Sequence, residues 1–208
     1  MDLSEVAVGD TPLVTLTFLF TDIEGSTALW EEEADSMRVA LQRHNTLLSS
    51  AVASYGGWVF KTVGDAFCVS FDRAPDALQT AREIQHLLST EEWPTRTPLR
   101  VRVALHTGPA YLSAGDYFGK TVNRCSRLLA VARGGQTLLS SSTEALVREG
   151  LPPDMSLHDL GMLRLRDLVQ PVHAFQLIHA GLPKDLLKLA NTTTRRRASD
   201  RTTLPFTS

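Results

Sequence analysis

The sequence predicts an α+β fold with a ferredoxin-like βαββαβ core and C-terminal β/α additions. Three patterns point to it: an apolar segment in which threonine alternates with larger apolar residues, a long amphipathic stretch, and two short β-rich segments around a Gly-Asp pair. Of the 208 residues 43% are hydrophobic, enough for one domain with its own core. We therefore expect an N-terminal extension over residues 1–12, one domain over 13–182 and a tail over 183–208.

The first strand and helix of this core follow from periodicity. Val14–Phe20 (VTLTFLF) alternates threonine with larger apolar residues, which is typical of a buried strand. Over residues 26–53 the apolar positions recur at helical spacing, so we expect a single long helix. Ser26 or Thr27 would cap its start, and Tyr55-Gly56-Gly57 would end it.

The rest of the core begins with two short β-rich segments. Trp58–Val63 and Ala66–Phe71 flank Gly64-Asp65, which predicts a hairpin with Asp65 at its tip. A helix over 74–90 and an alternating strand over 99–106 complete the predicted core. The additions are expected to be a helix at 121–132, a strand at 137–140, a helix at 143–148, and strands at 156–165 and 172–178.

Composition and charge exclude several classes of protein. Lys and Arg total 21 against 23 Asp and Glu, so the chain lacks the basic footprint of a nucleic-acid-binding protein. Its longest strongly apolar run, residues 13–20, is too short to span a bilayer, and the first residues lack the pattern of a signal peptide. Two cysteines cannot form a disulfide framework. We expect a cytoplasmic protein with no membrane span and no nucleic-acid partner.

The tail differs in charge from the rest of the chain. From Lys184 onward six residues are basic and two are acidic, a net charge of +4, so the remainder carries −6. Few residues in the tail could contribute to a core. We expect a disordered end, or a linker to a regulatory domain of a longer protein.

The first stretch suited to phosphate chemistry is residues 20–27 (FTDIEGST). Asp22 stands at the end of the buried strand, just before a small-residue turn into the helix. Backbone N–H groups at a helix start favour phosphate, and a carboxylate beside them could hold a divalent cation that bridges to the same phosphates. The simpler alternative is that Asp22, Ser26 and Thr27 only cap the helix.

The second stretch is residues 61–67 (KTVGDAF) at the predicted hairpin. Asp65, at the hairpin tip, could lie next to the end of the first strand and thus next to Asp22. Two aspartates there would hold two Mg²⁺ or Mn²⁺ ions about 4 Å apart, an arrangement suited to phosphoryl transfer. Alternatively, Gly-Asp simply makes a good turn.

The third stretch is residues 116–127 (DYFGKTVNRCSR). Asn123 and Arg127 are four residues apart on a predicted helix and therefore share one face. An amide and a guanidinium projecting together could orient a ribose and neutralise charge that develops on a phosphate. Arg124 points elsewhere and is interpreted as a solvated or structural cation.

In this order and spacing, the three stretches resemble the class III nucleotidyl cyclase catalytic domain, also called the adenylate and guanylate cyclase homology domain. The resemblance runs from about Val14 to Leu177. It implies the class III cyclase fold and an adenylate cyclase that converts ATP to 3′,5′-cyclic AMP and pyrophosphate. It also implies two divalent cations per site, Mg²⁺ or Mn²⁺, and a homodimer with two shared active sites.

The resemblance assigns a role to each candidate residue. Asp22 and Asp65, with Ile23 between strand and turn, match the metal-binding positions, and Asn123 and Arg127 match the residues that position the ribose and stabilise the transition state. Lys61 and Asp116 match the pair that selects adenine. The positions that match phosphate contacts are Glu24, Gly25, Ser26, Thr27 and, by a looser alignment, Arg166.

Base selection follows hydrogen-bond chemistry. Lys61 can only donate, which suits the ring N1 of adenine, and Asp116 can only accept, which suits the 6-amino group. Guanine presents the reverse pattern on that edge. Two alternatives remain from the sequence: a cyclase with a different preference, for GTP or a pyrimidine nucleotide, and a regulatory module that binds ATP without turnover.

Overall fold

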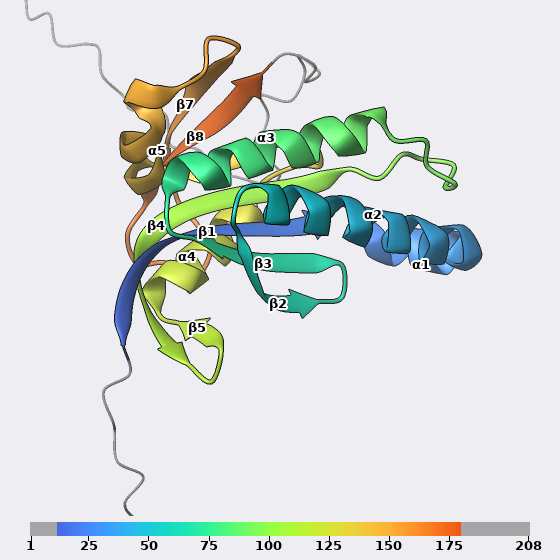
Figure 1. Cartoon of the computed structure of the whole chain (residues 1–208), viewed down its shortest axis with the longest axis horizontal. Helices are drawn as coiled ribbons and strands as arrows, with labels where there is room; N and C mark the ends of the chain where they lie inside the picture. The colour runs from blue at the N-terminus through green and yellow to red at the C-terminus, as the bar shows by residue number, and fades with distance from the viewer. Residues whose placement is uncertain (1–11, 180–208) are drawn as a thin grey trace, which may run out of the picture.

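The computed structural model describes residues 12–179 as one mixed sheet with helices on both faces (Figure 1). Almost all of the expected N-terminal extension and the whole expected tail lie outside the described residues. Among residues 12–179, no helix is both long enough and apolar enough to cross a membrane.

The elements follow the predicted order, with additions. The strands are β1 (Leu13–Ile23), β2 (Trp58–Val63), β3 (Ala66–Phe71), β4 (Val101–Ser113), β5 (Asp116–Phe118), β6 (Thr137–Ser140), β7 (Met155–Leu163) and β8 (Val172–His179). The helices are α1 (Ser26–Glu32), α2 (Ala34–Ser54), α3 (Ala74–Thr90), α4 (Lys120–Leu129), α5 (Ser141–Val147) and a 3₁₀ turn at Arg148–Gly150.

The strand order confirms the predicted fold class. The sheet runs β2-β3-β1-β4-β6-β8-β7, and β5 pairs with β4. Strands β1 to β4, with the helices α1, α2 and α3 that connect them, form the ferredoxin-like core. Strands β5 to β8 with α4 and α5 are the additions. β1 is central to this core, antiparallel to both β3 and β4.

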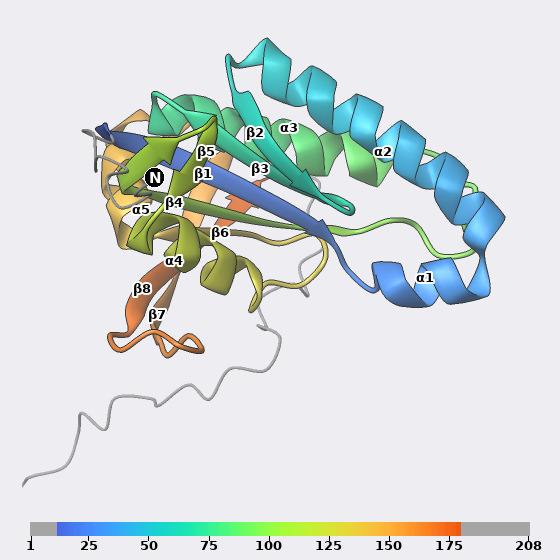
Figure 2. The same cartoon turned by 90° about the horizontal axis from the view of Figure 1, so that it is seen from below.

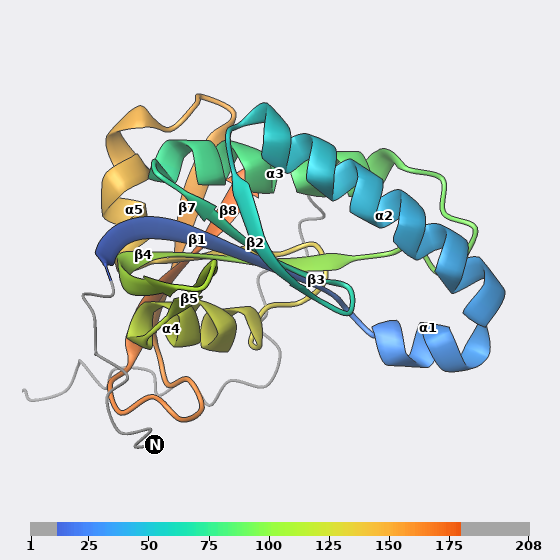
Figure 3. The same ribbon diagram turned by 60° about the horizontal axis from the view of Figure 1, so that its bottom comes forward.

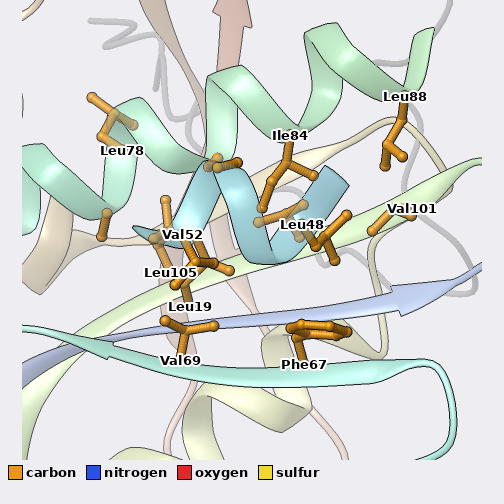
Figure 4. Packing of buried hydrophobic residues seen from close by; sticks show 14 of the residues in the cluster. Leu19, Leu48, Val52, Phe67, Val69, Leu78, Ile84, Leu88, Val101 and Leu105 are labelled. Atoms are coloured by element: carbon orange, nitrogen blue, oxygen red, sulfur yellow. The ribbon is translucent and has the colours of Figure 1, made fainter. Parts of the chain in front are cut away.

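Alternation along β1 divides the hydrophobic core into two clusters, one on each face of the sheet. Leu19 and Ile23 pack with α2 and α3, whose apolar faces meet over the sheet (Figure 4). Phe18 and Phe20 point to the other face, where they pack in the cluster that includes Leu128 of α4. The sheet is therefore covered on both sides, which explains the run of buried residues along β1.

The structure corrects the expected single helix over 26–53. The helix breaks at Glu33, whose backbone (φ −142°, ψ 45°) is not helical, and α1 and α2 lie at an angle to each other (Figures 2 and 3). α1 has no buried residue, whereas Met37 in the first turns of α2 is fully buried. The carboxylate of Glu33 accepts the backbone N–H of Arg96 (3.0 Å), which ties the break to the loop after α3.

The structure also corrects the strand expected over 99–106. β4 continues to Ser113 and turns through Ala114-Gly115 into β5, a short strand that periodicity did not predict. Both turn residues have positive φ, 49° and 78°, as in a two-residue hairpin. Asp116 is consequently the first residue of a strand.

Helix α4 packs close to β4 at Gly108. A Cβ atom at Gly108 would lie 2.9 Å from Thr121 Oγ1 and 3.2 Å from Thr121 Cγ2. Thr121 is held in place because its hydroxyl donates to the carbonyl of Pro109. Only glycine therefore fits the close approach of the helix that carries Asn123 and Arg127.

We expect Gly108→Ala to destabilise the protein by about 1–3 kcal/mol, because the added methyl group forces α4 away from the strand. The matched control is Gly150→Ala, since a Cβ atom there meets no heavy atom within 4 Å. The free energies of unfolding come from urea titrations of both variants. Equal stabilities for the two variants would contradict the close packing of α4.

Candidate active site

The tip of the β2–β3 hairpin lies beside the carboxyl end of β1, as the sequence predicts (Figures 2 and 3). Asp65 Oδ2 accepts the backbone N–H of Ile23 at 2.8 Å. Asp65 Oδ1 accepts the hydroxyl of Ser26 at 3.5 Å. These bonds hold the Asp65 carboxylate next to the strand end that carries Asp22.

The two carboxylates affect each other electrostatically. Burial raises the pKa of Asp22 above its usual value, the charge of Asp65 raises it further, and Arg102 partly opposes both effects. Arg102 is opposite Asp22 in the β1–β4 pairing, with Nη1 3.5 Å from Asp22 Oδ2. Arg102 was not predicted, because cross-strand register is not visible in a single sequence.

The donor set at this strand end fits a divalent cation that is shared with a substrate. In residues 12–179 no group of three or more His, Cys, Asp and Glu side chains is placed to form a complete metal site. Two neighbouring carboxylates instead match the usual mode of Mg²⁺, which takes one or two carboxylates and completes its shell with water and substrate phosphates. Asp22 and Asp65 would hold such an ion.

In the turn from Ile23 to Thr27, fewer backbone N–H groups are available to bind phosphate than the sequence predicts. The N–H of Ile23 is bound by Asp65, and that of Glu24 donates to the carbonyl of Arg100 at 2.9 Å. Gly25 has φ 72°, a left-handed conformation that leads the chain into α1. The first bond within the helix runs from the Leu29 N–H to the Gly25 carbonyl, so the N–H groups of Ser26 and Thr27 are among those with no acceptor within it.

Lys61 and Asp116 lie in direct contact. The Lys61 Nζ atom is 2.6 Å from Asp116 Oδ2, and this hydrogen bond raises the pKa of Lys61. Asp116 Oδ1 also accepts the N–H of Tyr117 at 2.8 Å, which fixes the carboxylate. The structure thus brings together the two residues expected to recognise the base, and the pair remains partly exposed.

A bulge in β2 gives Lys61 its direction. Val59 pairs with Val69 and Lys61 pairs with Cys68, so one extra residue, Phe60, is inserted in β2. Phe60 and Cys68 both pack against the cluster on the α4 face. Lys61 therefore lies on the same face as its partner Cys68. The thiol of Cys68 is half-buried, and burial is the main cause that raises its pKa to about 11.

Helix α4 presents Asn123 and Arg127 on its outer face. Thr121, Cys125 and Leu128 form its buried face, so Asn123 is exposed and Arg127 is half-buried. Arg127 Nη2 is 2.9 Å from Asp167 Oδ2, and Arg166 Nε is 3.6 Å from the same oxygen. Arg166 thus adjoins Arg127 through Asp167, a residue that the sequence analysis did not single out.

The candidate residues form three groups within one chain: the carboxylates at the end of β1, the Lys61–Asp116 pair, and Asn123 with the two arginines. Within the part of the chain that the structure describes, no hydrogen bond or ion pair joins one of these groups to another. None of the three groups is therefore fixed to another by a direct polar contact.

Comparison with known proteins places this geometry in a family. Residues 10–177 match the model of the adenylate and guanylate cyclase catalytic domain. An uncharacterized protein of Mycobacterium tuberculosis is 38% identical over 170 residues, which cover 81% of this chain and 57% of that protein. The chain thus spans little more than half the length of that relative.

Solved structures of similar fold include two adenylate cyclases. One, from Trypanosoma brucei and in its monomeric state, superposes with a TM-score of 0.73 at 27% identity, covering 86% of this chain and 95% of that one. The other, CyaB from P. aeruginosa, has a TM-score of 0.70 at 25% identity, covering 84% of this chain and 98% of that one.

We expect Asp22→Asn to raise the free energy of unfolding of the metal-free protein at neutral pH. Because the pKa of Asp22 is raised in the folded state, the folded protein keeps this proton to a higher pH than the unfolded chain does. Stability is therefore lost as the pH rises through that interval. Since the side chain is 33% exposed, the gain should be at most about 1 kcal/mol.

Urea denaturation at neutral pH and below the ordinary carboxyl pKa of 3.8 measures this effect, which should disappear at the lower pH. The exposed Asp72→Asn is the control and should change little at either pH. If Asp22→Asn proves less stable than the wild type at neutral pH, the electrostatic account of this carboxylate is wrong.

Proposed function

The chain belongs to the family of adenylate and guanylate cyclase catalytic domains, and we propose that it is an adenylate cyclase converting ATP to 3′,5′-cyclic AMP and pyrophosphate. The observation that carries the choice of ATP is the contact between Lys61 and Asp116. This pair offers a donor beside an acceptor, which matches N1 and the 6-amino group of adenine. That two structurally similar proteins are adenylate cyclases supports the same choice.

In this proposal the carboxylates of Asp22 and Asp65 hold two divalent cations, Mg²⁺ or Mn²⁺, together with the triphosphate. Bound there, such ions would lower the pKa of the ribose 3′-hydroxyl and offset charge on the departing pyrophosphate. The N–H groups of Ser26 and Thr27 at the start of α1 would donate to phosphate oxygens, and Gly25 allows the chain to turn beneath them.

Helix α4 supplies the groups that act at the reacting phosphate. Asn123 would hold the ribose so that its 3′-oxygen faces the α-phosphate. Arg127 would donate to the oxygens on which charge builds in the transition state, and removing such a donor typically costs about 10²–10³ in rate. Arg166, which adjoins Arg127 through Asp167, would contact the terminal phosphates.

We further propose that the active enzyme is a homodimer with two shared sites. Each site would take Asp22 and Asp65 from one chain and the base-selecting pair, Asn123 and Arg127 from the other. This division is supported by the β2–β3 hairpin, whose bulge puts Lys61 on the α4 face while Asp65 binds the end of β1. A two-fold arrangement would then complete two identical sites.

Product formation from ATP, GTP, CTP and UTP, each offered separately with Mn²⁺, tests the proposed reaction. We expect cyclic AMP from ATP, little or no product from the other nucleotides, and no product from Asp65→Ala. Asp72→Asn, an exposed carboxylate elsewhere, is the matched control and should retain full activity.

Each other outcome has a defined meaning. Turnover of GTP or a pyrimidine nucleotide in place of ATP would keep the cyclase and refute the role given to Lys61 and Asp116. Binding of ATP with no product at any protein concentration would instead support a regulatory module that does not turn ATP over.

Mixing two inactive variants tests the shared site. Each chain contributes one half-site of carboxylates and one half-site made of the base-selecting pair and α4. Asp65→Ala damages only the first of these, and Arg127→Ala damages only the second. Each is expected to be inactive alone, and an equal mixture should recover about a quarter of the wild-type activity, because half of the dimers contain one intact site of two.

The matched control is a mixture of Asp65→Ala with Asp22→Ala, whose lesions fall in the same half-site and which should stay inactive. Specific activity of the wild type should also rise with protein concentration as dimers form. A folded, fully exchanged mixture of Asp65→Ala and Arg127→Ala without activity would exclude the division of residues between chains.

A further inference from the structure

Asp167 occupies the place between the two arginines that the proposed function assigns to phosphate oxygens. One oxygen atom, Oδ2, lies 2.9 Å from Arg127 Nη2 and 3.6 Å from Arg166 Nε. Guanidinium groups bind carboxylate and phosphate oxygens with the same planar geometry. The carboxylate of Asp167 thus lies beside both guanidinium groups, where a phosphate oxygen of the substrate would lie.

Packing holds Asp167 in reach of α4. Its loop connects β7 and β8 and lies on the side of the sheet that carries α4 (Figures 2 and 3). Leu163 and Leu165 before it are buried in the cluster that includes Leu128 of α4, and Leu168 after it packs against the same cluster. The contact with Arg127 therefore belongs to an anchored turn.

The backbone around Asp167 forms a tight turn. Leu168 N–H donates to the carbonyl of Leu165 at 3.3 Å, so residues 165–168 form a tight turn with Asp167 as its third residue. Asp167 has φ 60°, where glycine or asparagine is favoured in such a turn. Aspartate, with its short polar side chain, also tolerates this conformation, so the turn directs the Asp167 side chain without disrupting the backbone.

We propose that Asp167 is a positioning residue that stands in for the substrate's phosphates in the nucleotide-free enzyme and is replaced by them on binding. This inference rests on the proposed function, since it needs Arg127 and Arg166 to be phosphate ligands. Asp167 keeps the two guanidinium groups together and neutralises part of their charge. A triphosphate or pyrophosphate displaces it by supplying more charge and more acceptor oxygens.

A ligand that carries a phosphate chain must displace Asp167 from the arginines, which weakens its binding. The chemical step follows this displacement and is unaffected by it. Removing the negative charge of Asp167 should therefore tighten the binding of pyrophosphate and lower KM for ATP, with kcat nearly unchanged. Because the ion pair is half-exposed, the expected change is about two- to fivefold, and it should shrink at high salt.

The experiment compares Asp167→Asn with wild type by calorimetric titration of inorganic pyrophosphate in the presence of Mg²⁺, and by the kinetics of ATP turnover. Asp154→Asn is the matched control, because it removes another partly exposed carboxylate from an ion pair with Arg82 of α3, on the opposite face of the sheet. It should change neither constant. Asp167→Gly is a second variant, since glycine suits φ 60° and preserves the turn.

The inference is supported if both Asp167 variants bind pyrophosphate more tightly and the gain disappears when Arg127→Ala is added. It is overturned if pyrophosphate binding is unchanged or weaker, or if kcat falls while KM stays constant. The titration separates this inference from the proposed function. A wild type that forms no cyclic nucleotide refutes the function, and the pyrophosphate constants still decide the role of Asp167.

Discussion

β1 hydrogen-bonds to β3 on one side and to β4 on the other, and its register determines where the candidate site residues lie. All eleven of its residues pair one for one with β4, which sets Asp22 opposite Arg102. Phe67 N–H donates to the buried hydroxyl of Thr21, which fixes the pairing with β3 near the hairpin. A slip by one residue would turn every side chain of β1 to the other face and bury Asp22 against α2.

Charged groups around the site neutralise one another within the chain. Lys61 is paired with Asp116, Arg127 with Asp167, and Asp22 with Arg102. Each pair is at least partly exposed, so each contributes little to folding stability and exchanges its partner readily. Ligands that bring both a hydrogen-bonding edge and a chain of phosphates would replace these internal partners. The nucleotide-free fold thus pairs Lys61 and Arg127 within the chain, whereas Arg102 compensates the charge of Asp22 beside Asp65 only in part.

Local patterns sufficed for the fold class and for the place of the hairpin tip, because both depend on short segments. The alternation at 14–20 and the Gly-Asp turn predicted β1 and the hairpin tip beside it. The break at Glu33 was missed because it depends on tertiary contacts, including the bond to Arg96. Arg102 and Asp167 were missed for the same reason, since the register of β1 and the packing of the β7–β8 turn bring them to the site.

The face of the sheet on which Lys61 lies could not be predicted from alternation along the strand. Counted from Val59, which packs against the core on the α2 face, simple alternation puts Lys61 on that same face, away from Asp116. The bulge inserts one extra residue, Phe60, into the strand, so Phe60 and Lys61 both lie on the α4 face. Asp65, four residues on, binds in a different direction, to the end of β1. One short hairpin therefore serves two surfaces, and this is the geometry that a site shared between two chains requires.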